Sequence, residues 1–188
     1  DQTIATNEDY AAEARAAAAR NARAVVMLEQ CSVPPNAEDD FASALYLAGR
    51  LNMPILLTDA IDELRAVGRG GLIDSDLRAA LNDLQELQKR ADENRLTIAG
   101  WTAPKVDLIT RRVRFRVSDD HPPSRPVTAE AATFDLAALC EDDAFINALA
   151  ALGENARMIA TTNELRVSRP REVRKMVAQR LTGRNVQQ

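Results

Sequence analysis

Several residue types are scarce in this 188-residue chain, and each scarcity narrows the kinds of protein that it can be. Aromatic residues make up only 4% of the sequence, so the core must rely on Ala, Leu, Val and Ile. Alanine has the best intrinsic helix propensity, and this composition therefore favours helices. Lysine is nearly absent, which leaves arginine as the main cation. Because the guanidinium binds carboxylates and phosphates bidentately, the arginines are the first candidates for specific contacts.

The chain has two cysteines, Cys31 and Cys140, too few for a disulfide scaffold at this length. Each stands beside apolar residues of an expected helix. We predict two buried free thiols. The alternative is a single bridge formed in an oxidising compartment.

His121 is the only histidine, which limits metal and hydrolytic chemistry. Asp119 and Asp120 precede it, but consecutive side chains rarely converge on one metal ion, and no second histidine offers the usual two-histidine spacing. A hydrolytic triad would need the same histidine, and the sequence contains no Gly-x-Ser-x-Gly elbow. We therefore expect no metal site, no cofactor and no enzymatic activity.

No apolar run approaches the roughly 20 residues that a membrane-spanning helix needs, so no membrane span is expected. No signal peptide is visible. The sequence begins at Asp1 without a methionine, which fits a processed or trimmed chain. The compartment in which the protein acts stays open.

Helical signals dominate the first half of the chain. An alanine-rich stretch and a shorter apolar stretch predict helices over residues 9–31 and 39–51. A third helix is expected at residues 59–67, with Thr58 as its N-cap. Asp74 or Ser75 is expected to cap a fourth helix, whose apolar stripe recurs at steps of three and four residues. The stripe consists of Leu77, Leu81, Leu84, Leu87 and Ala91.

The pattern changes at Arg95, where polar and apolar residues begin to alternate. This alternation predicts a β-hairpin over residues 95–118. In its second strand, Arg112, Arg114 and Arg116 would share one face.

Shorter elements are expected in the second half of the chain. They are helices at 129–140 and 143–152, the latter ended by Gly153, then a second hairpin turning at Asn163 and a basic helix from Pro170 to Gly183.

These elements predict a mainly α (α+β) fold with two lobes. The larger lobe, residues 1–121, would contain the first hairpin. A proline-rich linker, residues 122–126 within SDDHPPSRP, would lead to a smaller α-rich lobe at residues 127–188.

Charge is sorted along the chain although the net charge is only −4. Residues 1–94 hold nine basic and 17 acidic groups, whereas residues 95–126 hold seven and three. Residues 127–154 hold six acidic groups and no basic group, and residues 155–188 hold eight basic groups and two acidic ones. Blocks of opposite sign could pair within the chain, dock on another protein, face phosphate, or lie in solvent.

The candidate interaction residues are the cations of the expected arginine strand and of the terminal helix. Three arginines on one strand face would repel each other unless an acid or phosphate lies opposite, although charged edge strands also prevent aggregation. The candidates are Arg112, Arg114, Arg116, Arg171, Arg174, Lys175 and Arg180.

Two segments resemble those of AAA+ ATPases. PILLTDAIDEL at 54–64 resembles a Walker B strand, and MIATTNEL at 158–165 resembles a sensor strand that ends in Asn. The phosphate-binding loop, Gly-x-x-x-x-Gly-Lys followed by Ser or Thr, has no counterpart, and Ala60 stands where that family has an acid. No function is carried over from this resemblance.

The sequence therefore predicts a non-enzymatic adaptor or structural assembly subunit that acts through protein–protein contacts, with itself or with another protein, and through complementary charged segments. The alternative is a nucleic-acid-binding regulator that uses the arginine-rich hairpin and the basic helix. The acidic pI of about 5.2 and the lack of aromatic residues on the arginine face argue against that alternative.

Overall fold

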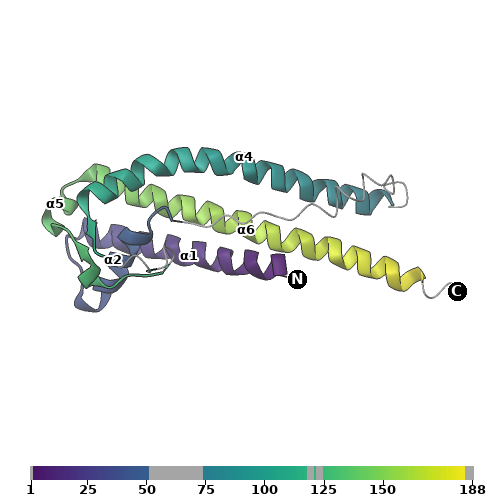
Figure 1. The fold of residues 1–188 in the computed structure, drawn as a ribbon, viewed down its shortest axis with the longest axis horizontal. Coiled ribbons are helices and arrows are strands. Elements are labelled where there is room, and N and C mark those ends of the chain that lie inside the picture. Colours follow the sequence, from purple (N-terminus) through teal and green to yellow (C-terminus); the bar gives the residue numbers. More distant parts are fainter. Residues whose placement is uncertain (1, 51–73, 118–120, 122–124, 185–188) are drawn as a thin grey trace. The chain divides into compact units, whose positions relative to one another are not determined.

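The computed structural model describes residues 2–50, 74–117, 121 and 125–184, and over these ranges the protein is mainly α-helical, as the sequence predicts (Figure 1). The elements in chain order are α1 (Gln2–Glu29), η1 (Pro35–Ala37), α2 (Glu38–Leu47), α4 (Ser75–Arg112), β1 (Arg114–Phe115), η3 (Ala129–Ala131), β2 (Ala132–Thr133), α5 (Leu136–Cys140) and α6 (Asp143–Arg184).

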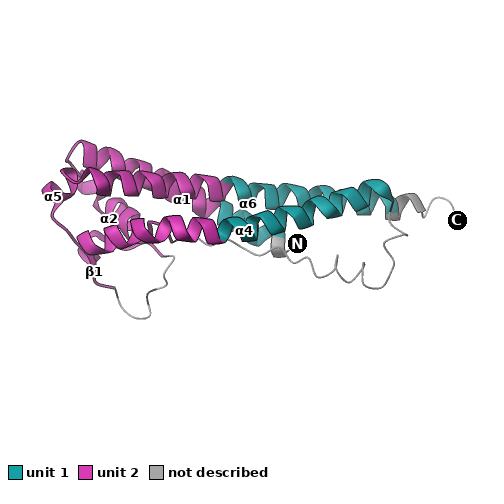
Figure 2. Cartoon of the chain, turned by 90° about the horizontal axis from the view of Figure 1, so that it is seen from above, with its two compact units in different colours: residues 1–11, 53–95, 161–188 teal, residues 12–52, 96–160 magenta. Residues whose placement is uncertain are grey.

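The chain divides into two compact units (Figure 2). Unit 1 contains residues 1–11, 53–95 and 161–188, and unit 2 contains residues 12–52 and 96–160. Helices α1, α4 and α6 each contribute residues to both units. The expected division into a larger lobe at residues 1–121 and a smaller lobe at residues 127–188 stays a prediction.

Unit 2 holds the main apolar core. Its buried side chains come from five helices and include Leu28, Phe41, Ile109, Leu139 and Phe145. Strands β1 and β2 form one antiparallel pair beside this core, in which Arg114 lies opposite Thr133 and Phe115 opposite Ala132. Helices, with one two-residue strand pair, therefore account for the regular structure described in this unit.

Acidic residues begin several helices of unit 2, as the clusters at 38–40 and 141–143 predict. The carboxylate of Asp142 accepts a hydrogen bond from the Phe145 N–H at 3.0 Å and caps α6. Asp39 accepts one from the Ala129 N–H at 2.7 Å, and Asp40 forms an ion pair with Arg23 at 2.7 Å. These acids are explained by helix capping and local pairing.

In unit 1, α4 runs antiparallel to α6, because Asp74 at the start of α4 contacts Arg180 near the end of α6. Asp74 accepts a hydrogen bond from the Leu77 N–H at 2.9 Å, which confirms the predicted cap of this helix. Along the predicted stripe, Leu84 and Ala91 are buried, and the other three leucines are half-buried.

The predicted strands within residues 95–112 are wrong, because α4 continues through Arg112. Ile98, Thr102, Val106 and Ile109 are buried or half-buried at steps of four, four and three, which is the period of a helix. Pro104 lies inside α4 but on its exposed side, and Lys105 Nζ donates to the Trp101 carbonyl at 2.7 Å. The proline that suggested a turn is therefore accommodated within the helix.

Three further expectations fail because α6 is continuous from Asp143 to Arg184. It has no end at Gly153, no hairpin at Asn163, and Pro170 is an interior residue. A Cβ atom at Gly153 would lie 3.1 Å from Cβ of Asn21, so this glycine serves close packing with α1. The AAA+-like sensor segment is likewise helical, and the expected helix at 129–140 is replaced by η3, β2 and the short α5.

The prediction of free thiols is also wrong. Cys31 and Cys140 form a disulfide with 5.4 Å between their Cα atoms. The spacing of 109 residues gave no sign that these two positions meet. The helix expected at 59–67, the Walker B-like segment and most of the linker lie outside the described residues.

Candidate functional site

The arginine row that alternation placed on one strand face is divided between two elements. Arg112 is the last residue of α4, and its Nη2 lies 2.9 Å from Oδ2 of Asp142 at the start of α6. Asp142 is mostly buried, so this ion pair joins the two helix ends in a partly desolvated place. Arg112 is therefore paired within unit 2.

Arg114 and Arg116 are different. Both are exposed, and the described part of the structure contains no carboxylate within 4.0 Å of either guanidinium. Arg114 belongs to β1, and the Arg116 N–H donates to the Ala131 carbonyl at 2.8 Å. The backbone thus fixes both residues and leaves their side chains accessible.

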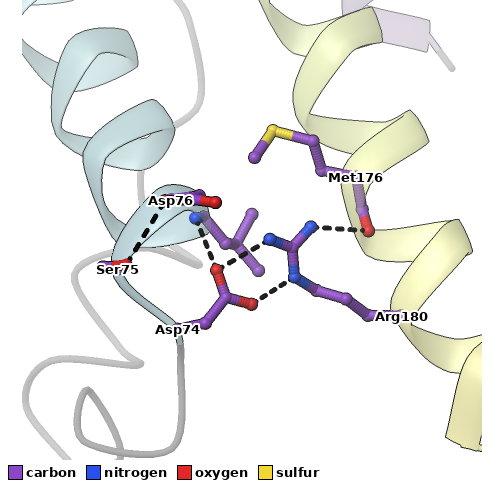
Figure 3. Close-up of polar contacts among 6 residues, drawn as sticks. Asp74, Ser75, Asp76, Met176 and Arg180 are labelled. Carbon is purple, nitrogen blue, oxygen red and sulfur yellow. Dashed lines mark hydrogen bonds and ion pairs between the residues drawn. The ribbon is translucent and has the colours of Figure 1, made fainter.

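The cations of the terminal basic segment lie on the second half of α6 in unit 1. Arg180 makes a bidentate contact with Asp74: its Nη2 donates to Oδ1 at 2.7 Å, and its Nε contacts Oδ2 (Figure 3). Its Nη1 also donates to the Met176 carbonyl at 3.1 Å. The hydrogen bonds from Arg180, together with the N–H of Leu77, lower the pKa of Asp74 from 3.8 to about 2.

Of the remaining candidates on α6, one also pairs with a carboxylate of unit 1. Arg171 forms an ion pair with Glu8 of α1, and Arg174 is exposed and makes an interaction of its own. Lys175 is exposed. Among the predicted interaction residues, Arg112, Arg171 and Arg180 thus meet carboxylates of their own unit. Of the seven candidates, the three that come first in the sequence belong to unit 2 and the other four to unit 1.

Unit 1 contains a buried polar layer that sequence reasoning missed. Arg166 is 1% exposed, and burial lowers its pKa, although the charge of Asp92 opposes that shift. Gln88, also buried, donates to Asp92 at 2.7 Å. Asn163 is fully buried, and among the described residues neither atom of its amide group has a hydrogen-bond partner. The sequence does carry a signal for this layer. Asn163 and Arg166 lie at steps of three and four residues from the buried apolar positions of α6 that begin at Phe145, but their polarity hides them from a search for apolar residues.

The second feature that was missed is apolar and exposed. Residues 96–104 of α4 contain no charged side chain, and most of them are exposed. Leu96 is 74% exposed and Trp101 59%, and a Cβ at Gly100 would meet no atom within 4 Å. We name this surface of unit 2 the α4 apolar patch. It comprises Leu96, Ala99, Gly100, Trp101, Ala103 and Pro104.

His121 has a structural environment of its own. Its ring packs edge-on against Tyr46 at 5.7 Å between centroids, and Nε2 lies 3.2 Å from the Arg125 carbonyl. Tyr46 also contacts Phe115, and the Arg50 guanidinium lies 4.2 Å from the centre of its ring. Within the described ranges, no three His, Cys, Asp or Glu side chains are grouped as a metal site would need. Asp119 and Asp120, which precede His121 and were considered with it as metal ligands, lie outside those ranges.

Comparison with known proteins gives no relative. No family model, no curated protein and no solved structure matches this chain. Among the helices in the described part of the chain, none is both long and apolar enough to cross a membrane.

Proposed function

We propose that the protein is a non-enzymatic assembly subunit, and that its contact surface is the α4 apolar patch. The observation that carries this proposal is the uncharged, exposed stretch at residues 96–104 with the single tryptophan of the chain near its middle. Cores of protein interfaces are depleted of charge and enriched in aromatic residues, and tryptophan is the residue most often found at their energetic centres.

The partner that fits this patch best is a second copy of the chain. A neutral surface offers no charge for a strongly acidic or basic partner to complement, whereas two copies present the same neutral surface to each other. A twofold contact of this kind is the commonest arrangement in soluble oligomers. Gly100 lets another helix approach closely, and Leu96 lies one turn before it on α4.

The test uses Trp101 as its own reporter. We expect light scattering after size exclusion to show a mass that rises with protein concentration, and the tryptophan emission to shift to the blue in parallel as Trp101 leaves water. Leu96→Glu keeps the reporter and should weaken association about ten- to hundredfold. Val117→Glu is the matched control, because it places a charge on another exposed apolar residue of unit 2.

A protein that stays monomeric at all concentrations, with constant tryptophan emission, would contradict self-association. If a different protein binds and protects Trp101 instead, the patch is an interface of another kind.

Nucleic acid is the second candidate, and one observation favours it: Arg114 and Arg116 are both exposed. The strand pair holds the backbone of Arg114, and the hydrogen bond to the Ala131 carbonyl holds that of Arg116. Phosphate binding would show as retention on mixed DNA at low salt that Arg114→Ala with Arg116→Ala abolishes. The same outcome with Arg171→Ala, Arg174→Ala and Lys175→Ala would instead assign the binding to α6. If the unsubstituted chain is not retained at low salt, this candidate is removed.

A further inference from the structure

The Cys31–Cys140 disulfide joins the end of α1 to the end of α5. Cys31 comes two residues after α1, Cys140 is the last residue of α5, and both belong to unit 2. Their Cα separation of 5.4 Å is within the ordinary range for disulfides. Helix α1 is thereby tied to a segment more than 100 residues away in sequence.

The backbone at Cys31 indicates that a sulfur atom is needed there. Its φ is 46°, in the left-handed region, and the N–H groups of Cys31 and Ser32 donate to Leu28 and Met27 at 3.0 Å each. Glycine is the usual residue at this position after a helix, because a Cβ atom is unfavourable there. A cysteine at this unfavourable position is therefore best explained by what its side chain does, and its sulfur atom forms the disulfide.

The elements near Cys140 need such a tie. Helix α5 has five residues, with Leu139 its one buried residue, and β1 and β2 have two residues each. Elements this short are not stable by themselves in water. Two residues beyond the bridge, Asp142 caps α6 and pairs with Arg112. The disulfide therefore fixes the region of unit 2 where α1, α5 and the start of α6 meet.

We propose that this bond is a permanent structural cross-link made in an oxidising compartment, and that the chain is a substrate of a thiol oxidant of the disulfide class that reacts first at Cys31. Cys31 is exposed, whereas Cys140 is half-buried against the core. The Cys31 thiolate attacks the disulfide of the oxidant, forming a mixed disulfide and releasing one oxidant thiolate. The Cys140 thiolate then attacks the sulfur of Cys31, and the second oxidant thiolate leaves. Two electrons pass to the oxidant, and the two thiol protons pass to solvent.

Thiol labelling of the full chain tests the bond and the order of attack. Protein denatured directly in alkylating agent should show no free thiol until a reductant is added. Reduction, or Cys31→Ser with Cys140→Ser, should lower the melting temperature by roughly 5–15 °C. With glutathione disulfide as the probe oxidant, the folded Cys140→Ser variant should form its mixed disulfide about tenfold faster than Cys31→Ser.

Each result decides part of the proposal. Two free thiols in protein taken from an oxidising compartment would overturn it, and so would a bridged chain whose melting temperature does not change on reduction. Equal rates for the two single variants would overturn attack at Cys31. None of these results depends on assembly through α4, so the two proposals can fail separately.

Discussion

Asp74 shows how one carboxylate can hold two helices of unit 1. It caps α4 through the Leu77 N–H and binds Arg180 of α6 through both of its oxygens. Because the ionised form makes these contacts, its pKa lies at about 2 rather than 3.8. A depressed pKa means that the stabilisation is complete above the ordinary pKa and is lost as the pH falls through the lowered one.

Asp74→Asn should therefore lower the melting temperature at pH 7, and the difference from the wild type should shrink between about pH 4 and pH 2. Asparagine remains a good N-cap, so the variant removes the ion pair and keeps the cap. Thermal unfolding followed by circular dichroism over this pH range measures the difference. A constant difference down to pH 2 would contradict the assigned ion pair.

Asn163 is a residue whose replacement should stabilise the protein. Its amide is fully buried and has no hydrogen-bond partner in the part of the chain that the structure describes, and an unpaired buried group costs about 1–3 kcal/mol. Asn163→Leu should therefore raise the free energy of unfolding by about 1–3 kcal/mol in denaturant titration. Asn147→Leu is the control on the exposed side of α6 and should change it by less than about 0.5 kcal/mol. A destabilised Asn163→Leu protein would show that the amide is satisfied in solution.

At the scale of elements, the helices α4 and α6 are longer than local signals suggest. Each contains a proline, Pro104 or Pro170, and a proline inside a helix costs about 3 kcal/mol. Ala91 and Ile109, on the two sides of Pro104, are buried, and so is Val167, one turn before Pro170. Helical stability in proteins comes mostly from such packing, and this explains why the prolines do not end these helices.

Two glycines of unit 2 provide a matched test of element packing. Gly49, just after α2, has a φ of +75°, and a Cβ there would lie 2.5 Å from Val106 Cγ2 and 2.7 Å from Thr102 Cγ2 of α4. Gly49→Ala should destabilise by about 2–4 kcal/mol through backbone strain and steric overlap. Gly100→Ala, on the open side of α4, should stabilise by about 0.5–1 kcal/mol because it improves helix propensity. Equal effects in denaturant titration would contradict the contact between Gly49 and α4.

At the scale of the whole molecule, the sorted charges are partly accounted for within each unit. Basic residues of α6 meet acids of α1 and α4 in unit 1, and the end of α4 meets the start of α6 in unit 2. The ion pairs of unit 1 are largely exposed and contribute little to stability, so they serve mainly to fix the pairing of helices. Because the proposed contact is apolar, we expect assembly to persist when the salt concentration rises from 0.1 to about 1 M. Association that disappears at high salt would point to Arg114 and Arg116 instead.

The sequence by itself determined the helical class, the existence of α1 and α2 but not their ends, and a capped helix start at Asp74 or Ser75. Propensity, capping and short-range periodicity depend on neighbours within a turn or two. The sequence also showed the separation of charge. It could not show that α4 and α6 continue through their prolines. Polar residues occupy inward positions, with Thr102 half-buried and Asn163 buried, and they obscure the helical period.

Only the tertiary structure decided which residues meet across the chain. Arg171 and Glu8 are 163 residues apart, Arg180 and Asp74 are 106 apart, and the two cysteines are 109 apart. The exposed side of α4 likewise could not be identified from the sequence. An apolar residue is expected to be buried unless the structure shows that its side of the helix is exposed. Local sequence preferences therefore determine most of the helices of this protein, and long-range packing determines the contacts between them, the disulfide and the exposed side of α4.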